Sequence, residues 1–174
     1  MTTASLPEIA EIWDWLSEVP DPEIPVVSVT ELGIIRDARY EGGTLVVAVT
    51  PTYSGCPATS VIDMMIEAKL REKGVEDLRL ERRLSPPWTT DWVSEAAREK
   101  LSAFGIAPPI DGTASDGGMA AKAARLSGKS NLSVACPRCG SANTERISQF
   151  GSTPCKASWR CKDCLEPFDY FKCI

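Results

Sequence analysis

The chain has 174 residues, of which 43% are hydrophobic and 25% charged, the balance of a folded protein. Its net charge of −5 argues against a general nucleic-acid binder, and no apolar run reaches the ~20 residues that span a bilayer. The chain contains no histidine, which excludes Ser-His-Asp triads, histidine-ligated catalytic zinc and Glu-x-x-His di-iron sites.

The N-terminal sequence, MTTASLPEIAEIW, has neither a basic start nor a long apolar stretch. We therefore expect no secretory signal and a cytoplasmic location. In that reducing compartment the seven cysteines are expected to be metal ligands or working thiols rather than disulfides.

The first third of the chain predicts a helix followed by a hairpin. Residues 6–18 place apolar side chains at helical spacing, namely Leu6, Ile9, Trp13 and Leu16. The sequence DPEIP at 21–25 ends this helix, because its two prolines deny the helix backbone donors and geometry. A turn and strand over 26–36 and a β-branched strand over 44–51 flank the Gly42-Gly43 turn signal.

A second helix is expected from Ala58 to Lys73, followed by Gly74. Its predicted buried stripe is Val61, Met64, Met65, Ala68 and Leu70. A strand over 75–84 and a helix from Asp91 to Phe104 follow. The resulting order, α-β-β-α-β-α, predicts a compact α+β domain over residues 6–106.

Residues 107–133 differ in composition from the rest of the chain. They are rich in Ala, Gly, Ser and Pro and almost lack large apolar side chains, so we expect a flexible linker. A cysteine-rich segment over 134–174 forms a second, smaller domain.

Two CxxC pairs, Cys136/Cys139 and Cys161/Cys164, lie in this segment. Two residues between thiolates let a tight turn direct both sulfurs at one metal, and two such pairs complete a closed tetrahedral site. Such sites usually stabilise segments too small to form a core, so we expect a structural zinc ribbon. Iron at the same four thiolates is the alternative.

Two further cysteines of this segment, Cys155 and Cys173, have no partner in this spacing. They are either buried small hydrophobes or accessory thiols near the ribbon. Three aromatic residues are expected to pack the small domain, with an exposed docking patch as the alternative: Phe168, Tyr170 and Phe171.

Cys56 lies in the sequence PTYSGCPATSVIDMM. Pro57 suits the first position of a helix, which places Cys56 at or beside its N-cap, where the helix dipole favours thiolate. Ser54 and Gly55 suggest a bent, accessible loop. The alternative is a buried capping residue.

Asp21 and Glu23 lie on the proline-stiffened DPEIP loop. They could ligate iron as hard oxygen donors or orient a group near Cys56. Loop carboxylates more commonly serve as solvated or capping groups.

The motifs DPEIPVVSVTELGIIRD and PTYSGCPA together resemble the iron–sulfur assembly domain family that includes bacterial SufT-type proteins. Glu31 stands where that family has aspartate before Leu-Gly. The resemblance implies that Cys56 is the family's reactive cysteine, that Thr52 lies beside it, and that Asp21 and Glu23 form its acidic loop.

With its ending SQFGSTPCKASWRCKDCLEPFDYFKCI, the whole chain resembles the PaaD family, also called PaaJ, of 1,2-phenylacetyl-CoA epoxidase components. The match covers residues 6–106 and 134–174. This resemblance implies a cytoplasmic accessory component of a di-iron monooxygenase system in phenylacetate catabolism.

The resemblance further implies a role in maturation, because the chain has neither a Rossmann fingerprint nor a ferredoxin cysteine run. In this role Cys56 would transiently hold iron or an iron–sulfur cluster for the epoxidase reductase or oxygenase subunits. A structural subunit docking onto the oxygenase is one alternative, and a Cys56-dependent thiol enzyme is another. A homodimer stays open, since a cluster held by one Cys56 per chain needs a second copy or extra ligands.

Overall fold

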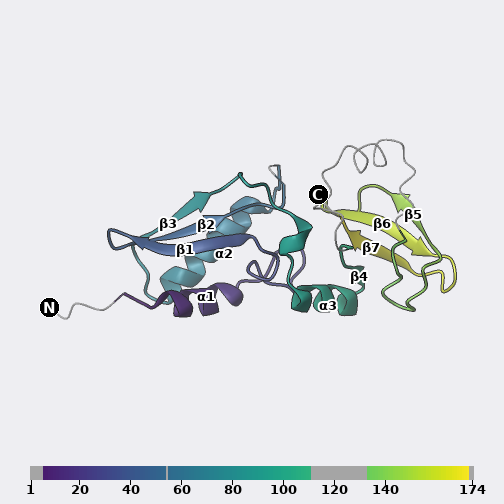
Figure 1. The fold of residues 1–174 in the computed structure, drawn as a ribbon, viewed down its shortest axis with the longest axis horizontal. Helices are drawn as coiled ribbons and strands as arrows, with labels where there is room; N and C mark the ends of the chain where they lie inside the picture. The colour runs from purple at the N-terminus through teal and green to yellow at the C-terminus, as the bar shows by residue number, and fades with distance from the viewer. Residues whose placement is uncertain (1–5, 54, 111–132, 173–174) are drawn as a thin grey trace. The chain divides into compact units, whose positions relative to one another are not determined.

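The computed structural model describes residues 6–53, 55–110 and 133–172, drawn in colour in Figure 1. The chain divides into two compact units between Trp88 and Thr89. Most of the expected linker at 107–133 lies outside the described residues. No helix in the described ranges is long and apolar enough to cross a membrane.

The first unit has five of the six elements predicted for residues 6–106, in the predicted order helix-strand-strand-helix-strand, and the sixth, a helix, belongs to the second unit. These elements are α1 (Ile9–Ser17), β1 (Ile35–Glu41), β2 (Thr44–Val49), α2 (Thr59–Glu72) and β3 (Leu78–Arg82). Strands β1 and β2 form the predicted antiparallel hairpin, and β3 pairs parallel to β2, so β2 is central. The α+β class predicted from the sequence is confirmed.

The apolar core of this unit lies between one face of the sheet and helices α1 and α2 (Figure 1). Helix α2 buries Ile62, Ile66 and Leu70. The predicted stripe was wrong except for Leu70, since Val61 is 39% and Met64 is 64% exposed. Both sets of residues follow the helical period, so spacing alone could not choose between the two faces.

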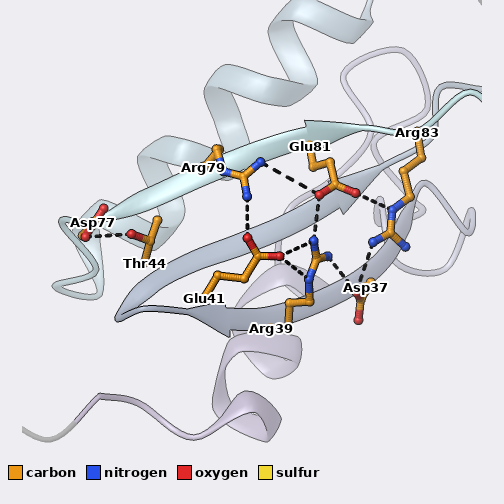
Figure 2. A network of polar contacts seen from close by, with 8 residues as sticks. All are labelled: Asp37, Arg39, Glu41, Thr44, Asp77, Arg79, Glu81 and Arg83. Carbon is orange, nitrogen blue, oxygen red and sulfur yellow. Dashed lines mark hydrogen bonds and ion pairs between the residues drawn. The ribbon is translucent and has the colours of Figure 1, made fainter.

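The other face of the sheet carries a network of ion pairs (Figure 2). Arg39 of β1 donates to Glu81 of β3, and Arg79 and Arg83 extend the network across the same face. Beneath it lie Val46 and Ala48 of the central strand, both fully buried. Side chains alternate between the two faces along β1 and β3, which places the charged residues on this face. Their long side chains cover the apolar residues of β2, as a packed helix would on the other face.

The second unit contains a short helical turn, one helix and a four-stranded sheet. Its elements are η1 (Thr90–Trp92), α3 (Glu95–Phe104), β4 (Ile106–Ala107), β5 (Thr144–Ser148), β6 (Lys156–Cys161) and β7 (Pro167–Phe171). Helix α3 begins four residues later than predicted, because Ser94 is its N-cap and accepts a hydrogen bond from the Ala97 N–H. It ends at Phe104 as predicted, and Gly105 is its C-cap.

Strand β4 was not predicted. It pairs parallel to β7 and extends the sheet to the order β4-β7-β6-β5. Ala107 belongs to the apolar cluster of this unit, and Ile110 packs against it. The buried Arg98 of α3 donates to the Pro109 and Thr90 carbonyls and so holds the segment before the ribbon together.

Candidate functional site

The four cysteines of the two CxxC pairs converge, with all four sulfurs within 4.8 Å of one another. The Cys136 and Cys164 sulfurs are 3.7 Å apart, and those of Cys139 and Cys161 are 3.6 Å apart. A tetrahedron with metal–sulfur bonds of about 2.3 Å has edges of about 3.8 Å. All four cysteines are free thiols at spacings that suit a shared metal ion rather than disulfides.

Each pair lies on a turn whose backbone has a left-handed residue immediately after the second cysteine. In the first turn this residue is Gly140, with φ of 75°, and its N–H donates to the Cys136 carbonyl. In the second turn it is Leu165, with φ of 64°. The backbone N–H of Cys164 points to the Cys161 sulfur at 3.5 Å. The two turns therefore present their sulfurs in the same way, although only one uses glycine.

A polar clamp joins the two turns. Asp163, between the last two cysteines, accepts hydrogen bonds from the Ser141 hydroxyl and the Asn143 amide of the first turn. Both hydrogen bonds lower the pKa of the Asp163 carboxyl, and the one from Ser141 has the larger effect. Sequence reasoning missed these residues, because their only signal is their place beside the cysteines.

The thiols have unequal acidities without a cation. The Cys164 backbone N–H lowers the pKa of Cys161 to about 7. A backbone hydrogen bond from Ser141 favours the Cys139 thiolate, but hydrogen bonding with Cys164, burial and the other two thiols raise its pKa to about 12. A divalent cation would supply the charge that lets all four ionise together. The donor set, which is closed and all-sulfur, fits zinc.

Cys56 lies on the turn that leads into α2. The helix begins at Thr59 with Ala58 as N-cap, so Cys56 lies two residues before the N-cap, not at or beside it as the sequence predicted. Its carbonyl accepts from the Thr59 N–H at 3.2 Å, and its own N–H donates to the Tyr53 carbonyl at 3.2 Å. Cys56 is partly exposed, whereas Cys155, the other described cysteine outside the ribbon set, is buried.

The residues before Cys56 are tightly placed. Thr52 is buried, and the Tyr53 ring packs over Gly55, where an added Cβ would lie 3.2 Å from a ring carbon. Ser54 lies outside the described residues. The chain bends at Thr52, Tyr53 and Gly55, as expected for this loop.

The acidic loop is shaped by Asp21. Its Oδ1 accepts hydrogen bonds from the N–H groups of Glu23, at 2.9 Å, and Ile24, at 2.8 Å. Asp21 is 8% exposed, while Glu23 is partly buried. Asp21 thus acts on the backbone of its own loop, as a capping carboxylate does.

The acidic loop and the Cys56 turn lie at the same end of the three-stranded sheet. The loop leads into the start of β1, and the turn follows the end of β2, its antiparallel neighbour. The Thr50 N–H donates to the Ile34 carbonyl at 2.8 Å and joins the two segments. Parallel pairing brings the end of β3 to this end as well.

Cys155 lies outside the four-sulfur group. Its side chain is buried and its sulfur is 3.0 Å from the Thr153 hydroxyl, which favours a packing role. Cys173 lies outside the described residues. The aromatic side chains of Phe168, Tyr170 and Phe171 are buried, and the first two belong to the apolar cluster of the ribbon, as expected.

The fold and the four-sulfur site together define an iron–sulfur assembly-type domain followed by a zinc-ribbon-type domain. Residues 9–77 match the family model of iron–sulfur cluster assembly proteins, and residues 120–172 match that of the PaaD zinc beta ribbon domain. Over its full length the chain is 44% identical to a protein of Escherichia coli K12 named as the D subunit of 1,2-phenylacetyl-CoA epoxidase, covering 98% of it. The chain belongs to this PaaD family.

Two other similarities each cover about half of the chain. The chain is 33% identical over 88 residues, 49% of its length, to the Fe-S protein maturation auxiliary factor YitW of Bacillus subtilis, covering 85% of that protein. A crystal structure of a domain of unknown function, DUF59, from Bacillus anthracis covers 53% of this chain, with 89% of its own length matched. It is 25% identical to this chain, with a TM-score of 0.49.

Proposed function

We propose that the protein is a maturation factor of a phenylacetyl-CoA epoxidase system. It would hold iron or an iron–sulfur cluster at Cys56 and transfer it to the reductase or oxygenase subunits. The observation that carries this proposal is the partly exposed Cys56, at the same sheet end as the acidic loop, in a domain of the iron–sulfur assembly family. The names of two relatives, an epoxidase subunit and a maturation factor, support both halves of it.

The transfer would be a ligand exchange without electron transfer. For an iron–sulfur client, the bond between the Cys56 sulfur and iron breaks as a cysteine sulfur of the client forms the new bond. The client thiol loses a proton, and the freed Cys56 thiolate takes one up. Such exchange needs an accessible thiolate with few competing ligands, which the four-cysteine set does not provide.

The ribbon is proposed as a zinc-stabilised docking module. Zinc thiolates in a closed set leave no position for a substrate, so the site would act on folding and recognition. Metal analysis of the purified protein tests this assignment. We expect one zinc per chain, and iron in that site would contradict it.

Replacing Cys56 with serine tests the maturation role directly. We expect Cys56→Ser to keep zinc content and circular dichroism unchanged. In co-expression with the epoxidase components, it should lower the iron content of the client by about tenfold or more, because serine is a poor ligand for iron. Iron and labile sulfide per purified client are the measured quantities.

Cys155→Ser is the matched control, because it makes the same atomic change at a buried cysteine outside both sites. Client loading should be normal with this variant. Normal loading with Cys56→Ser would contradict metal handling at Cys56. Stable co-purification with the oxygenase would then support the docking-subunit alternative.

A further inference from the structure

We infer that Trp88 is a positioning residue for the Cys56 site, acting through a hydrogen bond to the turn that supports the acidic loop. This inference rests on the proposed function of that site. Trp88 follows β3 in the sequence SPPW and is the last residue of the first unit. Neither its spacing nor its neighbours indicated a role.

The indole of Trp88 is 4% exposed, and its Nε1–H donates to the Leu32 carbonyl at 2.8 Å. The two residues are 56 positions apart in the chain. A buried indole N–H needs an acceptor, and here the acceptor is a carbonyl at a turn rather than one inside a strand or helix. The bond therefore ties that turn to the segment that follows β3.

The turn itself, residues 28–33, is held internally. Ser28 and Glu31 exchange side-chain and backbone hydrogen bonds, with the Ser28 N–H donating to Glu31 and the Glu31 N–H donating to the Ser28 hydroxyl. The Leu32 N–H donates to the Ser28 carbonyl at 3.0 Å, and Gly33 closes the turn with φ of 67°. Because the turn is tied at several points, a bond at Leu32 positions all of it.

This turn connects to both halves of the candidate site. On one side, Ser28 forms a β-bridge with Pro20, the residue before Asp21, and the Asp21 N–H donates to the Val27 carbonyl at 2.9 Å. On the other side, Ile34 accepts from Thr50, on the segment that leads to Cys56. A shift of the turn would therefore move the acidic loop relative to the Cys56 turn.

The test compares Trp88→Phe with Tyr40→Phe. Tyr40 is a matched control, because its hydroxyl also donates a long-range hydrogen bond to a backbone carbonyl, that of Pro7, at 3.0 Å in the same unit. Pro7 precedes α1 and is not part of the acidic loop. Both variants keep a phenyl ring at the site and lose one hydrogen bond.

The readout is the pH profile of Cys56 alkylation by iodoacetamide, followed by mass spectrometry on the zinc-loaded full chain. We expect Trp88→Phe to change the alkylation rate by about fivefold, the factor that corresponds to one hydrogen bond of ordinary strength. Client iron loading should fall with it. Tyr40→Phe should leave the alkylation profile unchanged, and it should lower the melting temperature less than Trp88→Phe, which also shrinks a buried ring.

Trp88→His tests rescue by the hydrogen bond alone. Imidazole fills less space than a phenyl ring, but it restores a ring N–H donor. Its alkylation profile should lie nearer to wild type than that of Trp88→Phe. Equal profiles for Trp88→Phe and Tyr40→Phe would overturn the inference. If instead Cys56→Ser loads the client normally, the proposed function fails, while the alkylation profiles still decide the role of Trp88.

Discussion

At the level of single residues, Asp21 shows how a candidate ligand can serve its own backbone. The sequence allowed two roles for this carboxylate, ligand or cap. Its Oδ1 accepts from the Glu23 and Ile24 N–H groups, which supports the second role. Glu23 supplies one of these N–H groups, and its role as a metal ligand stays a prediction.

Two substitutions separate these roles. Asp21→Asn keeps an oxygen acceptor and should retain client loading. Asp21→Ala loses the acceptor, and its free energy of unfolding should fall by about 1 kcal/mol. Urea unfolding and client iron content are the two measurements. If Asp21 is an iron ligand, both variants lose loading, because the amide removes the negative charge that iron prefers.

Some residues of the ribbon site could be predicted from the sequence and others could not. The four cysteines were predictable, since the spacing of each pair dictates the turn that carries it. Asp163, Ser141 and Asn143 were not, because their contacts form only once the two turns meet. Cys56 was expected at or beside the N-cap, whereas the N-cap is Ala58 and Pro57 lies between the two.

At the level of elements, the open face of the first sheet is covered by charge instead of a helix. Glu81 of β3 accepts from Arg83 and Arg39, and these two hydrogen bonds lower its pKa from 4.5 to about 2. The alternation of β3 predicted a half-exposed strand. Its parallel pairing with β2 could not be predicted, because the charged residues of a strand do not indicate which strand it pairs with or in which direction.

Because the pKa of Glu81 is lowered in the folded state, the stability of this unit decreases as the pH falls. Because the folded value lies below the unfolded one, the contribution is fully present above about pH 4.5 and is lost as pH falls towards 2. Glu81→Gln should therefore be less stable than wild type at neutral pH, and this difference should shrink across that window.

Urea midpoints measured between pH 7 and pH 2 by circular dichroism test this expectation. Loss of zinc in acid affects both proteins, so the difference between them isolates Glu81. Glu76→Gln is the control, since the exposed Glu76 lies outside the network drawn in Figure 2. A constant difference between wild type and Glu81→Gln would contradict the proposed linkage.

At the level of the whole molecule, the sequence predicted domains over 6–106 and 134–174 joined by a linker, whereas the two units of the structure divide between Trp88 and Thr89. The strand β4 could not be foreseen, because two residues, Ile106 and Ala107, are too short to show a period. Ala107 nevertheless packs in the same cluster as Cys136 and Trp159. The ribbon core is therefore built partly from chain that precedes its first cysteine.

A charge placed in β4 tests this dependence. Ala107→Asp would bury an unpaired carboxylate in the ribbon core, and we expect it to destabilise the ribbon by about 3 kcal/mol. Zinc release to a chromogenic chelator should be faster. Ala103→Asp, on the exposed face of α3, is the matched control and should release zinc as wild type does. Equal rates for both would show that β4 adds nothing to the metal site.

The two turns that carry the ribbon cysteines differ at the residue after the second cysteine, and this difference bears on the backbone strain at the metal site. The first turn reaches its left-handed position with Gly140, at no steric cost, whereas the second does so with Leu165, a conformation unfavourable by roughly 1 kcal/mol for a residue with a side chain. Without a metal ion, the turn of Cys136 and Cys139 therefore carries less backbone strain than the turn of Cys161 and Cys164. A metal ion held by all four sulfurs would offset that strain in the second turn.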